Sequence, residues 1–286
     1  MKILVSENAG ACYGVMRALT IAEEALSKEL PTYSLGPLIH NPQVVADFQA
    51  RGLEVIEQVA EAKEGILVIR SHGVAPQIIE QARSLGLEIV DATCSNVLRV
   101  QEAVRSLRAQ DYQVIIVGEA GHPEVESIRA HAGVGTLVVL VPEDLPADLS
   151  NTKRIGVVVQ TTQTPEALDA IVAELTARGV EHRVHNTICP ATHKRQVSSA
   201  ELAHNVDCMI VIGGRNSGNT TRLYEICKAI CPNTHHIESP DEIDPAWFAG
   251  ETEGETEYLV GVTAGASTPN QQIVSVLKAL TALDAS

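Results

Sequence analysis

The chain has 286 residues and a formal net charge of −15, with 45 % hydrophobic and 3 % aromatic residues. This length suffices for two or three α/β units. The charge and the few aromatics argue against nucleic acid or an anionic membrane surface as a partner, since these need basic or stacking surfaces. No apolar run could span a bilayer, and MKILVSENAG is too short and polar for a secretory signal. We expect the protein to be cytoplasmic. If it came from a photosynthetic eukaryote, a plastid-like compartment would be expected instead, although no transit peptide is visible in this chain.

The predicted strands are short runs rich in Val and Ile, each followed by a turn and a helical pattern. After the N-terminal strand, the runs are GILVIR (65–70), LEIV (87–90), QVIIVG (113–118), RIGVVVQ (154–160), DCMIVIGG (207–214) and EYLVGV (257–262). Runs that are apolar on both faces and alternate with helices indicate parallel sheets. The predicted fold class is therefore α/β with mostly parallel sheets.

A weak internal repeat points to several related domains. EIVDATCSNVLRVQEAV and RVHNTICPATHKRQVSSA each give a strand, Thr near Cys, and a polar helix, while ENAGACYGVMRALTIAEEA has Gly in place of Thr. Such repeats predict three similar small α/β domains, residues 1–95, 96–185 and 186–286. Function in parallel sheets lies at the carboxyl ends of strands, so three domains facing a common centre would bring these loops together.

The six cysteines divide by context. Cys12, Cys94 and Cys189 lie in turns marked by Gly or Thr. The other three lie in apolar or helical surroundings, which favours buried small side chains; they are Cys208, Cys227 and Cys231. Thiolates at helix N-termini are stabilised by the helix dipole and suit metal ligation. Three of them could hold zinc with a fourth ligand, or an iron–sulfur cluster with one iron open.

Three of the ten histidines lie in loops at strand ends beside Gly and Pro: His40, His72 and His122. Their N–H groups can donate to an anion such as phosphate without a lysine. The remaining histidines lack this context and are predicted to be surface or structural residues.

The loop GGRNSGNTTRLYEI opens a helix after a buried strand. Small residues there let a phosphate approach the N–H groups at the positive end of the helix. Ser217, Asn219 and the later Ser267 add neutral donors, although ordinary N-capping explains any one of them equally well. The loop is neither a Walker A motif nor a GxGxxG fingerprint.

Glu124 follows His122 by two residues and is the predicted proton carrier, with Glu119 and Glu126 as nearby competitors. A solvated glutamate in a first helical turn is the simpler alternative. Thr161 and Thr162 in QTTQT are predicted to hydrogen-bond a substrate hydroxyl or the glutamate. The alternative is a strand-end pair that satisfies its own backbone.

Nine motifs occur in order from about residue 8 to residue 270: GACYGVMRA, GPLIHNPQVV, RSHGV, VDATCSNV, GHPEVE, QTTQT, NTICPAT, GGRNSGNTTRL and GVTAGAST. Each is weak alone, but the ordered set is specific. It resembles the 4-hydroxy-3-methylbut-2-enyl diphosphate reductase family, the last enzymes of the methylerythritol phosphate (non-mevalonate) route to isoprenoids.

The resemblance implies three α/β domains in a pseudo-threefold arrangement around a central [4Fe–4S] iron–sulfur cluster. It implies Cys12, Cys94 and Cys189 as the three cluster ligands, one iron being open, and Glu124 as the proton relay. Thr161 and Thr162 would orient the substrate alcohol. The residues implied to hold the diphosphate are His40, His72, His122, Ser217, Gly218, Asn219 and Ser267. Reductive dehydroxylation of (E)-4-hydroxy-3-methylbut-2-enyl diphosphate would give isopentenyl and dimethylallyl diphosphate, with reduced ferredoxin or flavodoxin as the electron donor.

Three positions depart from the usual family pattern. Gly218 stands where a second serine is frequent, Ser95-Asn96 where proline and an apolar residue are common after the cysteine, and Pro190 where an aromatic residue is frequent. Three alternatives stay open: a zinc-dependent phosphohydrolase on the three cysteines, a non-enzymatic iron–sulfur sensor, and a family paralogue with a changed substrate.

Overall fold

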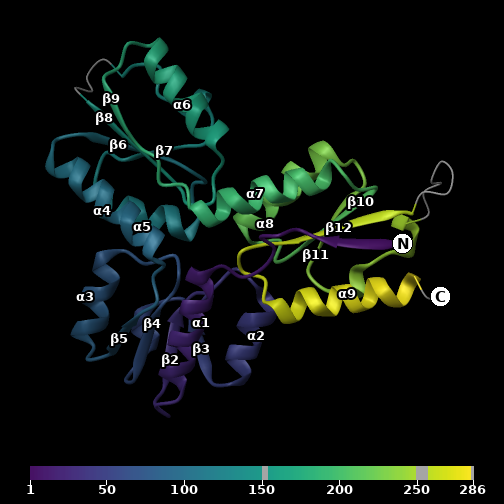
Figure 1. Ribbon diagram of the computed structural model, residues 1–286. Helices are drawn as coiled ribbons and strands as arrows, with labels where there is room; N and C mark the ends of the chain where they lie inside the picture. The colour runs from purple at the N-terminus through teal and green to yellow at the C-terminus, as the bar shows by residue number, and fades with distance from the viewer. Residues whose placement is uncertain (150–153, 249–256, 285–286) are drawn as a thin grey trace. The chain divides into compact units, whose positions relative to one another are not determined.

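The computed structural model describes residues 1–149, 154–248 and 257–284. Within these residues it contains three four-stranded sheets, and every strand pairing in them is parallel. Helices alternate with the strands along the chain (Figure 1). The predicted α/β fold class is confirmed. Each of the six apolar runs named from the sequence is a strand within a residue or two of its expected bounds.

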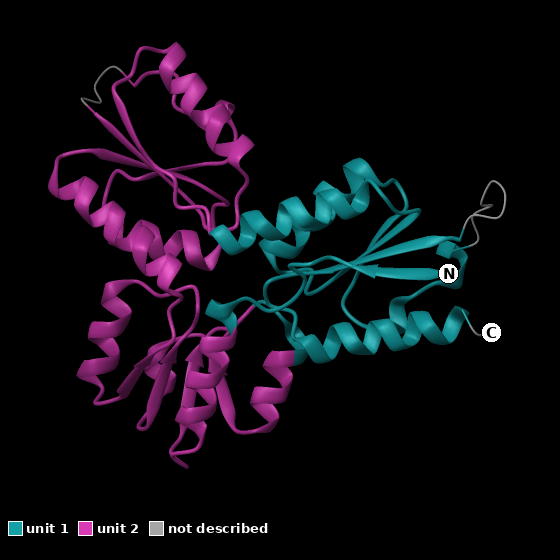
Figure 2. Ribbon diagram, viewed as in Figure 1, with its two compact units in different colours: residues 1–15, 40–43, 190–286 teal, residues 16–39, 44–189 magenta. Residues whose placement is uncertain are grey.

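The chain forms two compact units (Figure 2). Unit 1 comprises residues 1–15, 40–43 and 190–286, and unit 2 comprises residues 16–39 and 44–189. Unit 1 contains one of the three sheets, and unit 2 contains the other two.

The sheet of unit 1 has the order β1-β12-β10-β11. Its strands are β1 (Lys2–Val5), β12 (Leu259–Ala264), β10 (Cys208–Ile212) and β11 (Thr234–Ile237). The helices that pack on it are α7 (Pro190–Ala203), α8 (Gly218–Ile230) and α9 (Asn270–Asp284). Alternate residues of β10 face opposite sides: Ile210 and Ile212 pack toward α9, while Met209 and Val211 pack toward α7 and α8. A strand buried on both faces explains the continuous apolar run CMIVI.

The first sheet of unit 2 has the order β3-β2-β4-β5. Its strands are β2 (Thr32–Leu35), β3 (Leu53–Ile56), β4 (Ile66–Ile69) and β5 (Glu88–Asp91). Three helices belong to this part of the chain: α1 (Tyr13–Leu26), α2 (Pro42–Ala50) and α3 (Pro76–Ser84). Leu67 and Ile69 of the central β4 pack with Ala82 of α3. This packing anchors the loop that connects β4 to α3.

The second sheet of unit 2 has the order β7-β6-β8-β9. Its strands are β6 (Gln113–Val117), β7 (Leu137–Val139), β8 (Ile155–Val159) and β9 (His182–His185). The helices are α4 (Ser95–Ala109), α5 (Pro123–Ala132) and α6 (Pro165–Ala177). Ile115 and Val117 face α6, whereas Val114 and Ile116 face α4 and α5. Helices on both faces fix the orientation of the loops at the strand ends.

The N-terminal strand differs from the expected division into residues 1–95, 96–185 and 186–286. Residues 2–5 pair with β12 near the other end of the chain, so β1 belongs to the C-terminal sheet. Pairing of KILV with LVGV covers a strand edge that would otherwise expose backbone N–H and C=O groups. The remaining boundaries of the three predicted domains stay a prediction.

None of the helices within the described residues is long and apolar enough to cross a membrane.

Candidate active site

In unit 1, three neighbouring strands end at one edge of the sheet, and their loops carry predicted site residues. Cys12 follows β1, and its backbone N–H donates to the carbonyl of Ala266 after β12 at 3.0 Å. Gly265 N–H donates to the carbonyl of Ile212 at the end of β10 at 2.9 Å. The loops after β1, β12 and β10 are therefore joined through their backbones.

Residues 40–43 are bound to the same edge. Ser267 Oγ donates to the carbonyl oxygen of His40 at 2.9 Å. Asn41 Nδ2 donates to the carbonyl oxygen of Ser267 at 2.9 Å and to Gln272 Oε1 at 3.0 Å. The structure thus brings His40 and Ser267 together, although their predicted role in diphosphate binding stays a prediction. It adds Asn41, whose only sequence signal was its place in GPLIHNP.

The first turn of α8 presents the other predicted residues of unit 1. Ser217 is the N-cap, and its side chain accepts from Thr220 N–H at 3.3 Å, which leaves its own O–H free to donate elsewhere. Gly218 is the first helical residue, so its N–H is among the unpaired donors of the helix end. Asn219 is buried, and its Nδ2 has no hydrogen-bond partner among the residues that the structure describes.

Backbone glycines make this loop compact. A β-carbon at Gly265, or at Gly213 with its φ of 147°, would overlap the side chain of Thr220 in α8. Glycine at both positions lets α8 approach the ends of β10 and β12 closely.

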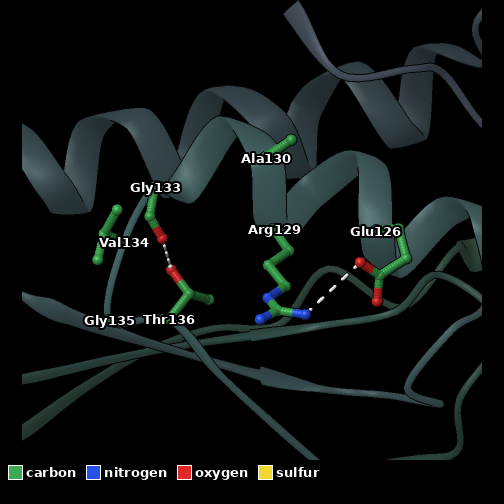
Figure 3. A pocket seen from close by; sticks show the side chains of 7 residues that line it. All are labelled: Glu126, Arg129, Ala130, Gly133, Val134, Gly135 and Thr136. Carbon is green, nitrogen blue, oxygen red and sulfur yellow. Dashed lines mark hydrogen bonds and ion pairs between the residues drawn. The ribbon is translucent and has the colours of Figure 1, made fainter.

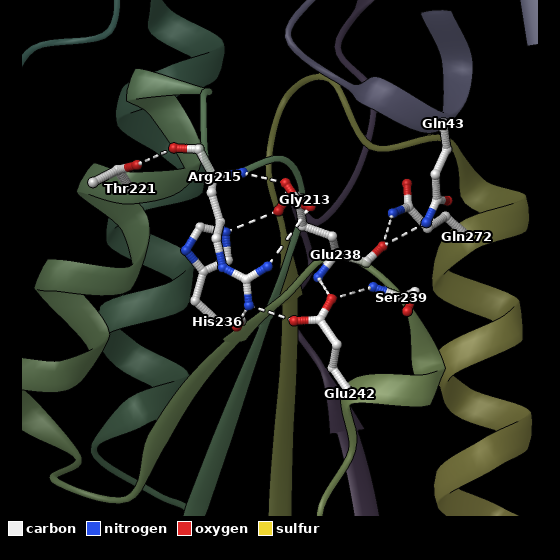
Figure 4. A network of polar contacts seen from close by, with 9 residues as sticks. All are labelled: Gln43, Gly213, Arg215, Thr221, His236, Glu238, Ser239, Glu242 and Gln272. Carbon is white, nitrogen blue, oxygen red and sulfur yellow. Dashed lines mark hydrogen bonds and ion pairs between the residues drawn. The ribbon is translucent and has the colours of Figure 1, made fainter. Parts of the chain in front are cut away.

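A network of polar contacts holds the loop before α8 to the end of β11 (Figure 4). The guanidinium of Arg215 pairs with the carboxylate of Glu242, and its backbone N–H donates to Glu238 Oε1 at 2.7 Å. The carbonyl oxygen of Glu238 accepts from Gln43 Nε2 at 2.9 Å and from Gln272 Nε2 at 2.5 Å. The charge of Arg215 is therefore paired with carboxylates. Through these pairs, Arg215 holds the loop in position.

In unit 2, His72 and His122 lie edge to face, with ring centroids 5.9 Å apart and an interplanar angle of 87°. His122 caps α5, because its Nδ1 accepts the backbone N–H of Glu124 at 3.1 Å. Burial and the charge of Arg70 lower the pKa of His122 to about 4. His122 is thus neutral near pH 7, and since Nδ1 is an acceptor, the ring proton sits on Nε2.

Glu124 is buried and receives two hydrogen bonds from one residue. The backbone N–H of Thr161 donates to Oε1 at 2.7 Å, and Thr161 Oγ1 donates to Oε2 at 2.7 Å. Burial raises the pKa of Glu124 above its ordinary value, although the bonds from Thr161 oppose this. The predicted contact between the glutamate and QTTQT is present at Thr161. Thr162 is half-buried beside it.

The competing glutamates have other surroundings. Glu126 is exposed and accepts Gly121 N–H at 3.2 Å, and it lies 3.6 Å from Arg129. Glu119 donates its backbone N–H to Gln160 Oε1 at 2.9 Å. Gln160 is fully buried, and its Nε2 has no partner in the described part of the chain. Sequence reasoning missed Gln160, although it directly precedes Thr161.

Two of the three predicted metal ligands are connected within unit 2. Cys189 N–H donates to the carbonyl of Thr161 at 2.9 Å, and Cys94 N–H donates to the carbonyl of Ser71 at 3.0 Å. Asn96, two residues after Cys94, donates from Nδ2 to Cys189 Sγ at 3.2 Å. Cys189 therefore lies at the N-terminus of α4, which begins directly after Cys94.

The six thiols have two kinds of environment, and none is in a disulfide. Cys12, Cys94 and Cys189 are half-buried, and each directly precedes the first residue of a helix. The other three are buried, and burial raises the pKa of two of them, Cys208 and Cys227, to about 12. Within either unit, no group of three or more His, Cys, Asp or Glu side chains that could hold a metal ion occurs among the described residues.

A pocket of about 410 Å³ lies elsewhere in unit 2, at the C-terminal end of α5 (Figure 3). Its lining includes Glu126, Arg129 and Val134, and Val134 is 92 % exposed. After this helix end the chain enters the start of β7. The pocket therefore lies where a strand begins, whereas the predicted site residues follow the carboxyl ends of the strands.

Comparison with known proteins gives consistent matches over nearly the whole chain. A family model described as LytB protein matches residues 3–281. The 4-hydroxy-3-methylbut-2-enyl diphosphate reductase of Geobacter metallireducens is 46 % identical over 284 residues, covering 99 % of this chain and 98 % of that protein. The enzyme of the same name from Pelobacter propionicus is 47 % identical over 277 residues, covering 97 % and 96 %.

Two solved structures are also similar. One is (E)-4-hydroxy-3-methyl-but-2-enyl diphosphate reductase, described as the terminal enzyme of the non-mevalonate pathway, at 45 % identity and a TM-score of 0.71; the match covers 98 % of this chain and 99 % of that one. The other is the E-1-hydroxy-2-methyl-but-2-enyl-4-diphosphate reductase of Plasmodium falciparum, at 27 % identity and a TM-score of 0.88, covering 98 % and 88 %.

Proposed function

The chain belongs to the LytB protein family, and on this premise we propose that it is a 4-hydroxy-3-methylbut-2-enyl diphosphate reductase. The allylic C–O bond breaks, two electrons and two protons are taken up, and the hydroxyl leaves as water. The products are isopentenyl and dimethylallyl diphosphate. The observation that carries the proposal is the unbroken series of contacts in unit 2 from His72 through His122, Glu124 and Thr161 to Cys189.

The diphosphate of the substrate is bound by neutral donors. His122 offers Nε2–H because its Nδ1 is already occupied by Glu124 N–H. Ser217 offers its hydroxyl proton, Gly218 its backbone N–H and Asn219 its buried amide. Neutral donors at a helix N-terminus suit a polyanion in a protein of net charge −15, because they need no lysine cluster. The remaining members of the proposed diphosphate site are His40, His72 and Ser267, and the Ser267 hydroxyl already donates to the carbonyl oxygen of His40.

Glu124 supplies a proton to the departing hydroxyl. Its raised pKa keeps a larger fraction protonated near neutral pH than an ordinary glutamate would have. Thr161, whose hydroxyl is 2.7 Å from Oε2, relays the proton and orients the substrate alcohol together with Thr162. Burial of this pair excludes water that would compete for the proton.

The thiols fit a [4Fe–4S] cluster held by Cys12, Cys94 and Cys189. These are the half-buried cysteines, each at the start of a helix whose dipole stabilises a thiolate. When bound, such a cluster supplies the two electrons one at a time and an open iron that acts as a Lewis acid toward the substrate oxygen. Reduced ferredoxin or flavodoxin is the proposed electron donor. Six free thiols suit a reducing compartment, so we place the protein in the cytoplasm.

The proposal is tested on protein purified without oxygen. We expect iron and acid-labile sulfide at about four each per chain, and conversion of the diphosphate substrate to the two products with a low-potential electron donor. Zinc at about one per chain without sulfide, together with phosphate release, would instead identify a phosphohydrolase. A full cluster without turnover of this substrate would point to a sensor or to a paralogue with another substrate.

A further inference from the structure

Asn96 has no role in the proposed reaction as described above, yet its side chain contacts one of the proposed cluster ligands. It lies in the first turn of α4, two residues after Cys94, and its Nδ2 is 3.2 Å from Cys189 Sγ. The two residues are 93 positions apart in the sequence and belong to the same unit. Ser95-Asn96 was also one of the departures from the usual family pattern.

The backbone around Cys189 is held independently of Asn96. Cys189 N–H donates to the carbonyl of Thr161, at the end of β8. Thr187, two residues earlier, bonds the backbone of Val159 through its hydroxyl, accepting from N–H at 2.8 Å and donating to C=O at 2.5 Å. Because the segment before Cys189 is bound to β8, the amide of Asn96 contacts the sulfur of a residue whose backbone is already held in place.

The direction of the hydrogen bond follows from the chemistry of the ligand. A metal-bound thiolate has no proton and can only accept, so the amide must turn its N–H₂ group toward the sulfur. A hydrogen bond to a charged acceptor is about twice as strong as a neutral one. It withdraws electron density from the sulfur, and hydrogen bonds to the sulfurs are among the factors that set the potential of an iron–sulfur cluster.

We propose that Asn96 is a positioning residue that donates a hydrogen bond to the Cys189 thiolate and raises the reduction potential of the cluster. Reduction adds negative charge to the cluster, and the N–H donor stabilises the reduced form more than the oxidised form. This inference rests on the proposed function, since it requires Cys189 to be a cluster ligand.

The test is a redox titration of the loaded protein with Asn96→Leu, which keeps the approximate size of the side chain and removes the donor. Losing one hydrogen bond to a charged group should shift the one-electron equilibrium toward the oxidised form by about threefold to tenfold, or about 28 to 59 mV. Asn96→Ala, a good helix former, gives the same result if leucine disturbs assembly. Asn96→Gln keeps the donor and should retain the wild-type potential.

The matched control is Asn205→Leu. Asn205 is exposed, follows α7 in unit 1, and its side chain donates to the carbonyl of Glu201 in that helix, so its replacement should leave the potential unchanged. A midpoint potential in Asn96→Leu and Asn96→Ala equal to that of wild type, at full iron and sulfide content, would overturn this inference alone. Absence of iron and sulfide from the wild-type protein would overturn both the cluster and the inference.

Discussion

At the scale of single residues, the chemistry of unit 2 depends on one buried carboxyl group. Burial raises the pKa of Glu124, while the two bonds from Thr161 lower it by a smaller amount. A group whose pKa is higher in the folded than in the unfolded state stabilises the fold fully below its unfolded pKa. That contribution is lost as the pH rises through the folded pKa. The same property that suits Glu124 to its proposed role as proton donor therefore costs stability at higher pH.

Glu124→Gln should separate these two effects. Glutamine has the size of a protonated glutamate, and it can accept from Thr161 N–H while donating to Thr161 Oγ1. We expect turnover to fall by about 10²- to 10⁴-fold, the usual contribution of general acid catalysis. The melting midpoint of the variant should increase relative to that of wild type as the pH rises above the ordinary pKa of glutamate.

Glu126→Gln is the control, because Glu126 is exposed on the same helix and lies outside the series of contacts from His72 to Cys189. It should change neither turnover nor the pH dependence of melting. Wild-type turnover in Glu124→Gln would remove Glu124 from the reaction.

Arg70, at the end of β4, presents a half-buried charge whose Nε atom is buried. A β-carbon at Gly36, which has a φ of 67°, would overlap its guanidinium. Burial lowers the pKa of Arg70, the exposed Glu57 offsets this only in part, and Arg70 Nε has no hydrogen-bond partner among the described residues. In the absence of a ligand, such a cation opposes folding.

Arg70→Met should therefore stabilise the ligand-free protein, because it removes the charge and keeps an unbranched apolar stem. We expect a gain of about 1 kcal/mol, seen as a rise of roughly 2 to 4 °C in the melting midpoint. Arg178→Met is matched to it, since Arg178 pairs with Glu174 at 2.7 Å, and it should not raise the midpoint. A lower midpoint in Arg70→Met would mean that the guanidinium stabilises the fold.

The sequence identified residues whose chemistry is local and missed those defined by distant partners. Glu124 and Thr161 stand in recognisable motifs, and the structure joins them. Asn96 carried no positive signal, because its partner is 93 residues away. Gln160 and Arg70 each look like an ordinary polar residue at a strand end, and what distinguishes them is a buried side-chain nitrogen without a hydrogen-bond partner among the described residues.

At the scale of elements, charged contacts hold the loop 213–217 before α8 to the end of β11. Arg215 pairs with Glu242 and Glu238, and the backbone of Glu238 accepts from Gln43 and Gln272. These contacts connect the loop to β11, to residues 40–43 and to α9. The placement of Ser217 and Asn219 for the diphosphate should depend on this connection.

Arg215→Met should raise the KM for the diphosphate substrate by about threefold to tenfold and leave kcat nearly unchanged. The effect is modest because exposed ion pairs contribute little individually, and the backbone contacts of the loop remain. Arg51→Met is the control, since Arg51 also pairs with two carboxylates, Glu23 and Asp47, on an exposed surface. Equal kinetics in the two variants would show that the loop does not need Arg215.

Strands with apolar runs were predictable, whereas polar edge strands and strand order were not. β10 and β8 are buried on both faces, and their apolar composition indicates a strand from the sequence alone. β11 has the sequence THHI and lies at a sheet edge, where half-exposed polar residues carry no strand signal. The pairing of β1 with β12 depends on a contact between the two ends of the chain, which a local pattern cannot contain.

At the scale of the whole molecule, the cysteines divide into two classes with different chemistry. Cys208 and Cys227 lie in apolar clusters, and with a pKa of about 12 each stays a neutral thiol near pH 7. A neutral buried thiol is a poor metal ligand, since the thiolate is the form that binds. Cys12, Cys94 and Cys189 are half-buried, lie at helix starts, and are free of disulfides.

This division predicts opposite results for two serine variants measured in the same way. Cys94→Ser should lose most of its iron and acid-labile sulfide, because a hydroxyl at the start of α4 is a much weaker ligand for iron than a thiolate. Cys227→Ser should keep the wild-type iron and sulfide content. Its cost should instead appear as a lower melting midpoint, since the new hydroxyl enters an apolar cluster between β10 and α8. Iron lost from Cys227→Ser and retained in Cys94→Ser would reverse the ligand assignment, and the cluster would then have to be sought among the buried thiols of unit 1.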